Sequence, residues 1–198
     1  RLHGRRSDWR AAEAILRDLV RAFPADPAVR NDLAAVLAEQ GRLEEATALA
    51  EEGTRRFPEV AENWYVLGLC HDKTGGTARA EAAFLACVAR KPGYARAWSD
   101  LGVIAAQRQD ADAALERFSR AVAADPFLPE AQYNLGRFLV LSRIDFDRGL
   151  HLLAAVADGS SPWAAHADKM LDDLILIGRG GDPGWTAHPE NGNRKETP

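Results

Sequence analysis

The sequence Trp-Tyr-Val-Leu-Gly at residues 64–68 recurs as Trp-Ser-Asp-Leu-Gly at residues 98–102, and a weaker copy, Gln-Tyr-Asn-Leu-Gly, occupies residues 132–136. The three copies are evenly spaced along the chain, with the same 34-residue interval both times. Three copies with one spacing indicate an internal repeat, and a repeat of this length is typical of proteins built from stacked supersecondary units. The repeat therefore decides the fold class before any other feature of the chain.

An alanine, a large aromatic residue and a proline follow each of the first two copies in the same phase. They are Ala80, Phe84 and Pro92 after the first copy, and Ala114, Phe118 and Pro126 after the second. The combined pattern resembles the tetratricopeptide repeat. The resemblance implies an all-α fold in which antiparallel helix pairs stack into a right-handed superhelical solenoid. Proline suits the end of the second helix because it lacks the N–H that a continuing helix needs.

Small residues predict where the two helices of a pair approach each other. Gly68 and Gly102 lie on the first helices, and we expect them to face Ala80 and Ala114 on the second helices. Phe84 is expected, like its counterpart in the next repeat, to fill the space between one pair and the next. A larger residue at a close crossing would force the helices apart.

The phase of the repeat divides the chain into segments. We expect a partial leading repeat over residues 1–26, whose second helix covers about residues 8–22, and full repeats over 27–60, 61–94, 95–128 and 129–162. The last of these is divergent, because an insertion around residues 143–147 displaces the expected alanine to Gly149. A capping helix is expected over 163–177 to cover the apolar face of the last pair, followed by an irregular tail over 178–198.

Composition excludes several classes of protein. Of the 198 residues, 46% are hydrophobic and 27% are charged, which favours a folded chain over a disordered one. No apolar run approaches the roughly 20 residues of a membrane span, so we expect no direct membrane insertion. The net charge of −4, from 29 acidic and 25 basic residues, leaves no uniform positive field for a nucleic acid.

No arrangement of residues indicates catalysis or metal binding. The five histidines form no His-Glu-x-x-His motif, and the two cysteines form no Cys-x-x-Cys motif. Cys70 and His71 are adjacent, but neighbouring helical side chains point about 100° apart and cannot share a small ion. Cys70 and Cys87 are interpreted as small buried residues, with a disulfide between them left open. We therefore predict no enzyme activity, no catalytic residue, no cofactor and no metal.

The resemblance also implies a binding surface, because the first helices of such a stack line its concave face. We predict that a peptide or helix of a partner protein binds there, with an acidic group beside apolar anchors. The candidate partner-binding residues are Asn31, Tyr65, Leu69, Lys73, Arg96, Val103, Tyr133, Arg137 and Leu141. The competing interpretation is that this face is only the solvated surface of a scaffold and binds no partner.

One known subtype of the family clamps the C-terminal carboxylates of chaperones with lysines, asparagines and an arginine. Asn31 fits that set, but Ala35, Val66 and Asp100 stand where polar or basic groups would be needed, so a chaperone co-factor is not expected.

The predicted function is a non-enzymatic interaction adaptor or assembly scaffold, with membership of a larger complex left open. The alternatives are a repeat region excised from a larger enzyme or membrane-anchored assembly factor, which the truncated leading pair favours, and a structural spacer or self-assembling subunit. The sequence leaves the cellular compartment open.

Overall fold

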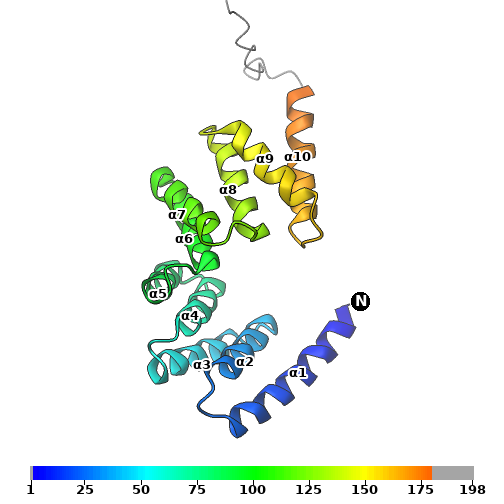
Figure 1. Ribbon diagram of the computed structural model, residues 1–198. Coiled ribbons are helices and arrows are strands. Elements are labelled where there is room, and N and C mark those ends of the chain that lie inside the picture. The colour runs from blue at the N-terminus through cyan, green and yellow to red at the C-terminus, as the bar shows by residue number, and fades with distance from the viewer. Residues whose placement is uncertain (1, 180–198) are drawn as a thin grey trace, which may run out of the picture.

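Ten α-helices and no strand make up residues 2–179 of the computed structural model, which describes these residues and, over residues 9–175, their side chains. The helices are α1 (Leu2–Ala22), α2 (Pro27–Glu39), α3 (Leu43–Arg56), α4 (Ala61–Lys73), α5 (Thr77–Arg90), α6 (Ala95–Gln107), α7 (Ala111–Ala124), α8 (Pro129–Ser142), α9 (Phe146–Ala157) and α10 (Ala164–Arg179). They wind into a curved stack around a hollow, with α2 and α4 on the hollow side and α3 and α5 outside (Figure 1). The chain is a helical solenoid.

The ends of the stack differ from the expected helix bounds. The leading helix, α1, begins at Leu2 rather than near residue 8, and α10 continues to Arg179, past the predicted end at 177. The rest of the predicted tail lies outside the described residues. The division of the chain into repeats stays a prediction, because it concerns the repeat phase and not the helix bounds alone.

The turn inside each hairpin repeats the same backbone conformation. Residues 41, 75, 109 and 143, which are evenly spaced in the phase of the repeat, all have a positive φ, between 57° and 79°. The first two are glycines, which adopt this left-handed conformation without steric cost. The last two are Gln109 and Arg143, whose side chains make the same turn less favourable.

The two central hairpins, α4–α5 and α6–α7, bring a glycine of the first helix against an aromatic ring of the second. A Cβ added at Gly68 would lie 2.4 Å from Phe84, and one added at Gly102 would lie 2.5 Å from Phe118. The neighbours closest to these glycines are therefore the rings, and the prediction that they are Ala80 and Ala114 is wrong. Both alanines are nevertheless completely buried.

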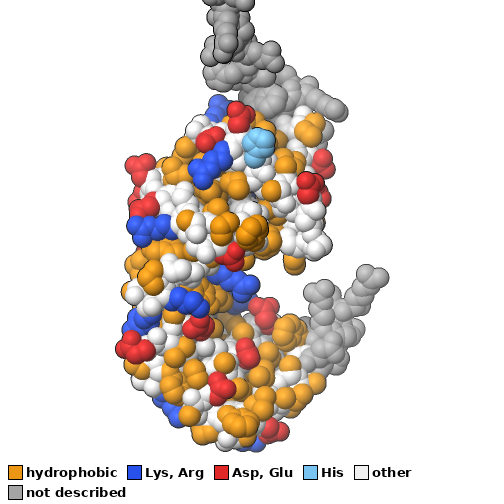
Figure 2. Space-filling view, viewed as in Figure 1, with side chains coloured by type: hydrophobic (Ala, Val, Ile, Leu, Met, Phe, Trp, Pro, Cys, Tyr) orange, Lys and Arg blue, Asp and Glu red, His pale blue; other side chains and the backbone are white. Residues whose placement is uncertain are grey.

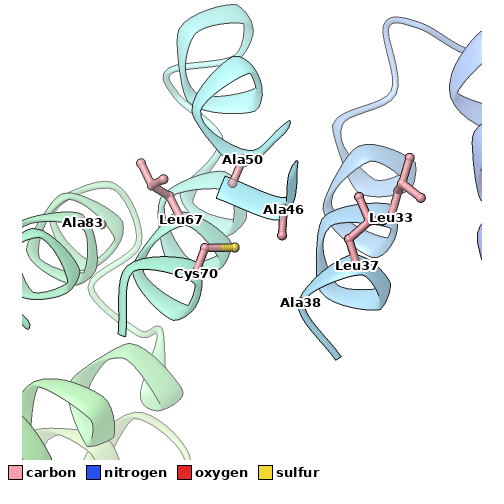
Figure 3. Packing of buried hydrophobic residues seen from close by; sticks show 8 residues of the cluster. All are labelled: Leu33, Leu37, Ala38, Ala46, Ala50, Leu67, Cys70 and Ala83. Atoms are coloured by element: carbon pink, nitrogen blue, oxygen red, sulfur yellow. The ribbon is translucent and has the colours of Figure 1, made fainter. Parts of the chain in front are cut away.

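The outer hairpins pack differently at the equivalent positions. In α2–α3, residues 34 and 50 are both alanine and both buried, and the core between α2, α3 and α4 is built from small and aliphatic side chains (Figure 3). In α8–α9 two glycines meet: a Cβ on Gly136 would lie 3.0 Å from the carbonyl oxygen of Gly149. The insertion before α9 thus places a second glycine at this crossing.

A recurrent hydrogen bond fixes the entry of each later first helix. The Nε1 group of Trp64 donates to the Pro58 carbonyl at 2.8 Å, and the Nε1 group of Trp98 donates to the Pro92 carbonyl at 2.7 Å. In α8 the Nε2 group of Gln132 replaces indole and donates to the carbonyl of the equivalent proline at 2.7 Å. Two arginines of the following second helices, Arg90 and Arg120, lie over the tryptophan rings, with 4.5 and 4.7 Å from guanidinium carbon to ring centroid.

Candidate partner-binding groove

A groove between α6, α7 and α8 brings together three of the predicted partner-binding residues, Val103, Arg137 and Leu141. The groove encloses about 440 Å³. Its lining consists of Val103, Ala106, Gln107, Phe118, Asn134, Arg137, Phe138, Leu141 and Ser142, and we call it the α6–α8 groove. Its size and its mostly apolar lining with a few polar groups are those of a binding site for a side chain or a short segment.

Helical spacing and two contacts hold the walls of the groove in place. Arg137 and Leu141 lie one turn apart on α8, so both project from one face of that helix. On the floor, the rings of Phe118 and Phe138 pack with centroids 5.5 Å apart. The Nδ2 group of Asn134 donates to the hydroxyl of a serine on α6 at 2.9 Å and ties α8 to that helix. The groove is thus preformed.

The rim of the groove exposes an apolar group and a positive charge. Leu141 is 58% exposed. Arg137 is exposed and forms no ion pair within 4 Å among the described residues. Its guanidinium can therefore receive a carboxylate through two parallel hydrogen bonds.

A second group of polar side chains lies nearer the beginnings of α6 and α8. The pKa of Asp100 is raised to about 7, first by burial and then by the negative charge of Glu130, while a side-chain hydrogen bond with Tyr65 opposes the rise. Burial also raises the pKa of Glu130, against the attraction of Arg96. Two carboxylates thus share a poorly solvated site with one arginine, and Figure 2 shows acidic and basic side chains close together on the wall of the hollow.

Tyr65 belongs to this second group and is packed among other aromatic rings. Its ring packs 4.8 Å from the ring of Tyr94 and 5.7 Å from that of Phe84, between centroids, and the residue is only partly exposed. Burial raises the pKa of its hydroxyl well above the usual range, so the hydroxyl stays protonated. Arg96 is exposed and forms no ion pair within 4 Å among the described residues.

Four of the predicted residues lie away from both groups or are already engaged. Asn31 is 8% exposed and its Nδ2 group donates to an asparagine of α4 at 2.9 Å, so it does not face the open groove as expected. The ammonium of Lys73 is paired with a carboxylate oxygen of α2 at 2.8 Å. Leu69 is partly buried and packs against the hydrophobic core formed by α4, α5 and α6. Tyr133 packs against Trp163, 5.1 Å between centroids, and is covered by the start of the last helix.

Several residues of these two groups are absent from the candidate set predicted from the sequence, among them Asp100, Asn134 and Phe138. One signal could have found two of them, because Asp100 and Asn134 occupy the same position in successive repeats and both are polar. Phe138 gives no such signal, since the equivalent residues 70 and 104 are a buried cysteine and a buried isoleucine.

The two cysteines lie in the hydrophobic core. Cys70 and Cys87 are both buried and free, which settles the question of a disulfide. Burial raises the pKa of their thiols to about 11 and about 12, so neither is a reactive thiolate near neutral pH. Within the described part of the chain, no three His, Cys, Asp or Glu side chains gather as metal ligands, and no helix has the length and apolar character of a membrane span.

Two family models described as tetratricopeptide repeat match the chain, one over residues 5–70 and the other over residues 65–129. Together they span more than half of its length, and the hairpins of the structure have the form that the family requires. The chain belongs to the tetratricopeptide repeat (TPR) family. A search of the curated proteins finds no match.

Solved structures of other proteins share the fold of this chain. TTC0263, a thermophilic TPR protein in Thermus thermophilus, superposes with a TM-score of 0.71 at 19% identity, covering 85% of this chain and 91% of its own. MamA (41-end) from Desulfovibrio magneticus superposes with a TM-score of 0.59 at 22% identity, and the match covers 77% of this chain and 85% of the MamA chain. Human IFIT1, solved as a dimer with PPP-AAAA, superposes with a TM-score of 0.67 at 16% identity, and the match covers 79% of this chain and 40% of the IFIT1 chain. At these identities the likeness concerns the fold alone, and TPR repeats make this chain a protein-interaction scaffold.

Proposed function

We propose that this TPR protein is a non-enzymatic adaptor that binds a segment of a partner protein in the α6–α8 groove. The observation that carries the proposal is the preformed apolar groove of about 440 Å³ whose rim exposes Leu141 and an unpaired arginine. An exposed leucine beside such a cleft can pack against an incoming apolar side chain, and the arginine can fix its orientation.

The alternative, in which this face is only the solvated surface of a scaffold, fits this part of the chain less well. A solvating surface has no need of a cleft lined by Val103, Phe118 and Phe138. Another charge of the inner face is paired between neighbouring helices, the ammonium of Lys73 with the carboxylate of Glu39. The α6–α8 groove combines an unfilled apolar volume with an unpaired charge, which is the composition that interfaces favour.

The experiment is a selection of short random peptides displayed on phage against the purified protein, followed by fluorescence anisotropy with the selected peptides. We expect Leu141→Glu to weaken binding about tenfold or more, because it places a charge at the mouth of an apolar cleft. The matched control is Leu85→Glu on the second helix α5, where the leucine is 43% exposed and remote from the groove. Circular dichroism would check that both variants keep their helices.

The proposal fails if the selected peptides bind Leu141→Glu as tightly as the unchanged protein. It also fails if Leu85→Glu weakens binding while Leu141→Glu does not, because the binding surface would then lie on the second helices.

A further inference from the structure

We infer that the bound segment carries a basic side chain for Asp100 and Glu130 and an acidic side chain for Arg137, with an apolar residue beside the acidic one that enters the α6–α8 groove. This inference rests on the proposed function and adds the chemistry and the order of the ligand's side chains. It is an argument from charge complementarity along one wall of the groove.

The two ends of the charge pattern lie on one face of α8. Glu130 and Arg137 are separated by close to two helical turns, so their side chains project in nearly the same direction. The rise of about 1.5 Å per residue places them about 10 Å apart along the helix axis. The apolar lining of the groove begins beside Arg137, at Phe138 and Leu141.

The acidic end has more negative than positive charge. Oδ2 of Asp100 is shielded from solvent and accepts no hydrogen bond from the described residues. The charges that act on it are Asp72 from α4, Glu130 from α8 and Arg96 from its own helix, so three carboxylates stand against one guanidinium. The neutral hydroxyl of Tyr65 forms a side-chain hydrogen bond with the Asp100 carboxyl, and it brings no positive charge.

A basic group of the ligand would correct this imbalance. A carboxylate withdrawn from water is unfavourable unless a cation or hydrogen-bond donor compensates it, and the raised pKa of Asp100 reflects that cost. A lysine or arginine side chain supplies both a positive charge and several donors. The surrounding rings of Tyr65 and Tyr94 would pack along its aliphatic stem.

The basic end has the opposite requirement. Arg137 is exposed and unpaired among the described residues, and the neighbouring polar groups of the rim, Gln107, Asn134 and Ser142, are neutral. An acidic side chain of the ligand is its natural partner. In an extended segment, which advances about 3.4 Å per residue, the basic and acidic residues would be about three positions apart, and in a helix about seven.

The same phage selection tests this, now run in parallel against the unchanged protein, Arg137→Glu and Glu130→Lys. The unchanged protein should enrich peptides with a basic and an acidic residue at one of those spacings and an apolar residue beside the acidic one. Arg137→Glu should replace the enriched acidic residue by a basic one, and Glu130→Lys should replace the basic residue by an acidic one. A peptide selected on the unchanged protein should bind either variant about tenfold more weakly, because like charges would meet.

Two further variants keep the outcome clear. Glu130→Gln removes the charge with little change of shape, and it should lose the preference for a basic residue even if Glu130→Lys folds poorly. Leu141→Glu reports on the groove itself. If Leu141→Glu abolishes the selection while the charge variants select the same charges as the unchanged protein, the charge inference is overturned and the groove remains the binding site. If Leu141→Glu leaves the selection unchanged, the proposed function fails and this inference fails with it.

Discussion

The central hairpins and the first hairpin have the same fold but carry different side chains at equivalent core positions. In α4–α5 and α6–α7 a glycine faces the ring of a phenylalanine, whereas in α2–α3 the same two positions hold Ala34 and Ala50. The turn within α2–α3 nevertheless has its left-handed residue, Gly41, at the position that Gly75 takes in α4–α5. The repeat therefore keeps the turn and the burial of these two positions, while the first hairpin fills its crossing with two methyl groups in place of a phenylalanine ring.

The first hairpin also differs from the central ones near the start of its first helix, and there the difference is expected to lower its stability. Where the central hairpins have Trp64 and Trp98, the first has Arg30, which is only 3% exposed. Its Nε and Nη1 groups have no hydrogen-bond partner among the described residues, and its Nη2 group lies 3.5 Å from Glu52. A buried guanidinium with idle donors is unfavourable. The first hairpin is therefore expected to be the weaker one.

The largest expected effect comes from removing the aromatic half of a central crossing. Phe118→Ala should lower the free energy of unfolding by about 3–5 kcal/mol, because Phe118 is 2% exposed and its loss leaves a cavity beside Gly102. The matched control is Phe127→Ala, at a phenylalanine that is 88% exposed, which should change stability by less than about 0.5 kcal/mol. Urea unfolding followed by circular dichroism measures both. Equal losses for the two variants would contradict the packing described for α6–α7.

The glycine half of the same crossing is the next test. Gly102→Ala should cost about 1–3 kcal/mol, since the new Cβ would lie 2.5 Å from the Phe118 ring and this overpacking outweighs the better helix propensity of alanine. Gly93→Ala is the control, because no atom lies within 4 Å of its added Cβ. The Gly102→Ala and Phe118→Leu double variant should lose less than the sum of the single variants. Strict additivity would show that the two residues do not share one volume.

A smaller effect, of opposite sign, is expected in the first hairpin. Arg30→Trp should raise the free energy of unfolding by about 1 kcal/mol, because it removes a buried charge with idle donors and restores the residue of the central hairpins. Thermal unfolding of the two proteins at one pH would measure the difference. A destabilised variant would mean that the first hairpin has no room for the ring and differs from the central ones in shape as well as in sequence.

The smallest effect concerns Asp100, whose folded pKa of about 7 exceeds its ordinary value. Between that ordinary value, about 4, and about pH 7, the folded state binds more protons than the unfolded state, so this group makes stability fall as the pH rises through that window. Asp100→Asn should flatten the pH dependence of the urea midpoint there. Asp32→Asn, at an exposed residue two repeats earlier, is the control. An unchanged slope in Asp100→Asn would show that its carboxyl is not desolvated.

Much of this fold can be predicted from the sequence, because the 34-residue phase is carried by residues that only one architecture uses together. Gly68, Gly102 and the tryptophans before them specify the crossing and the entry of the central first helices. The partner of each glycine could not be predicted in the same way, since Ala80 and Phe84 lie on one face of the second helix and only the crossing angle decides between them.

The candidate site could be predicted in part. Val103, Arg137 and Leu141 follow from the repeat phase, and the structure brings them together. Asn31 and Tyr133 occupy equally eligible repeat positions, but a hydrogen bond with an asparagine of α4 engages one and a tryptophan ring covers the other. Such contacts depend on which side chains the neighbouring hairpin carries, and a repeat pattern does not contain that information.

The contacts between helices give this stack an unusual mechanical character. Each helix packs chiefly against the next one along the chain and, for several, the one after that, and α1 and α10 lie apart at the two ends of the curved stack (Figure 1). Loosening can therefore begin at α1 or α10 and stop at the next hairpin, and amide hydrogens should exchange faster toward the ends than in the middle. The α6–α8 groove lies between the two ends of the stack, and a segment bound across its two hairpins should slow the exchange of their amide hydrogens further.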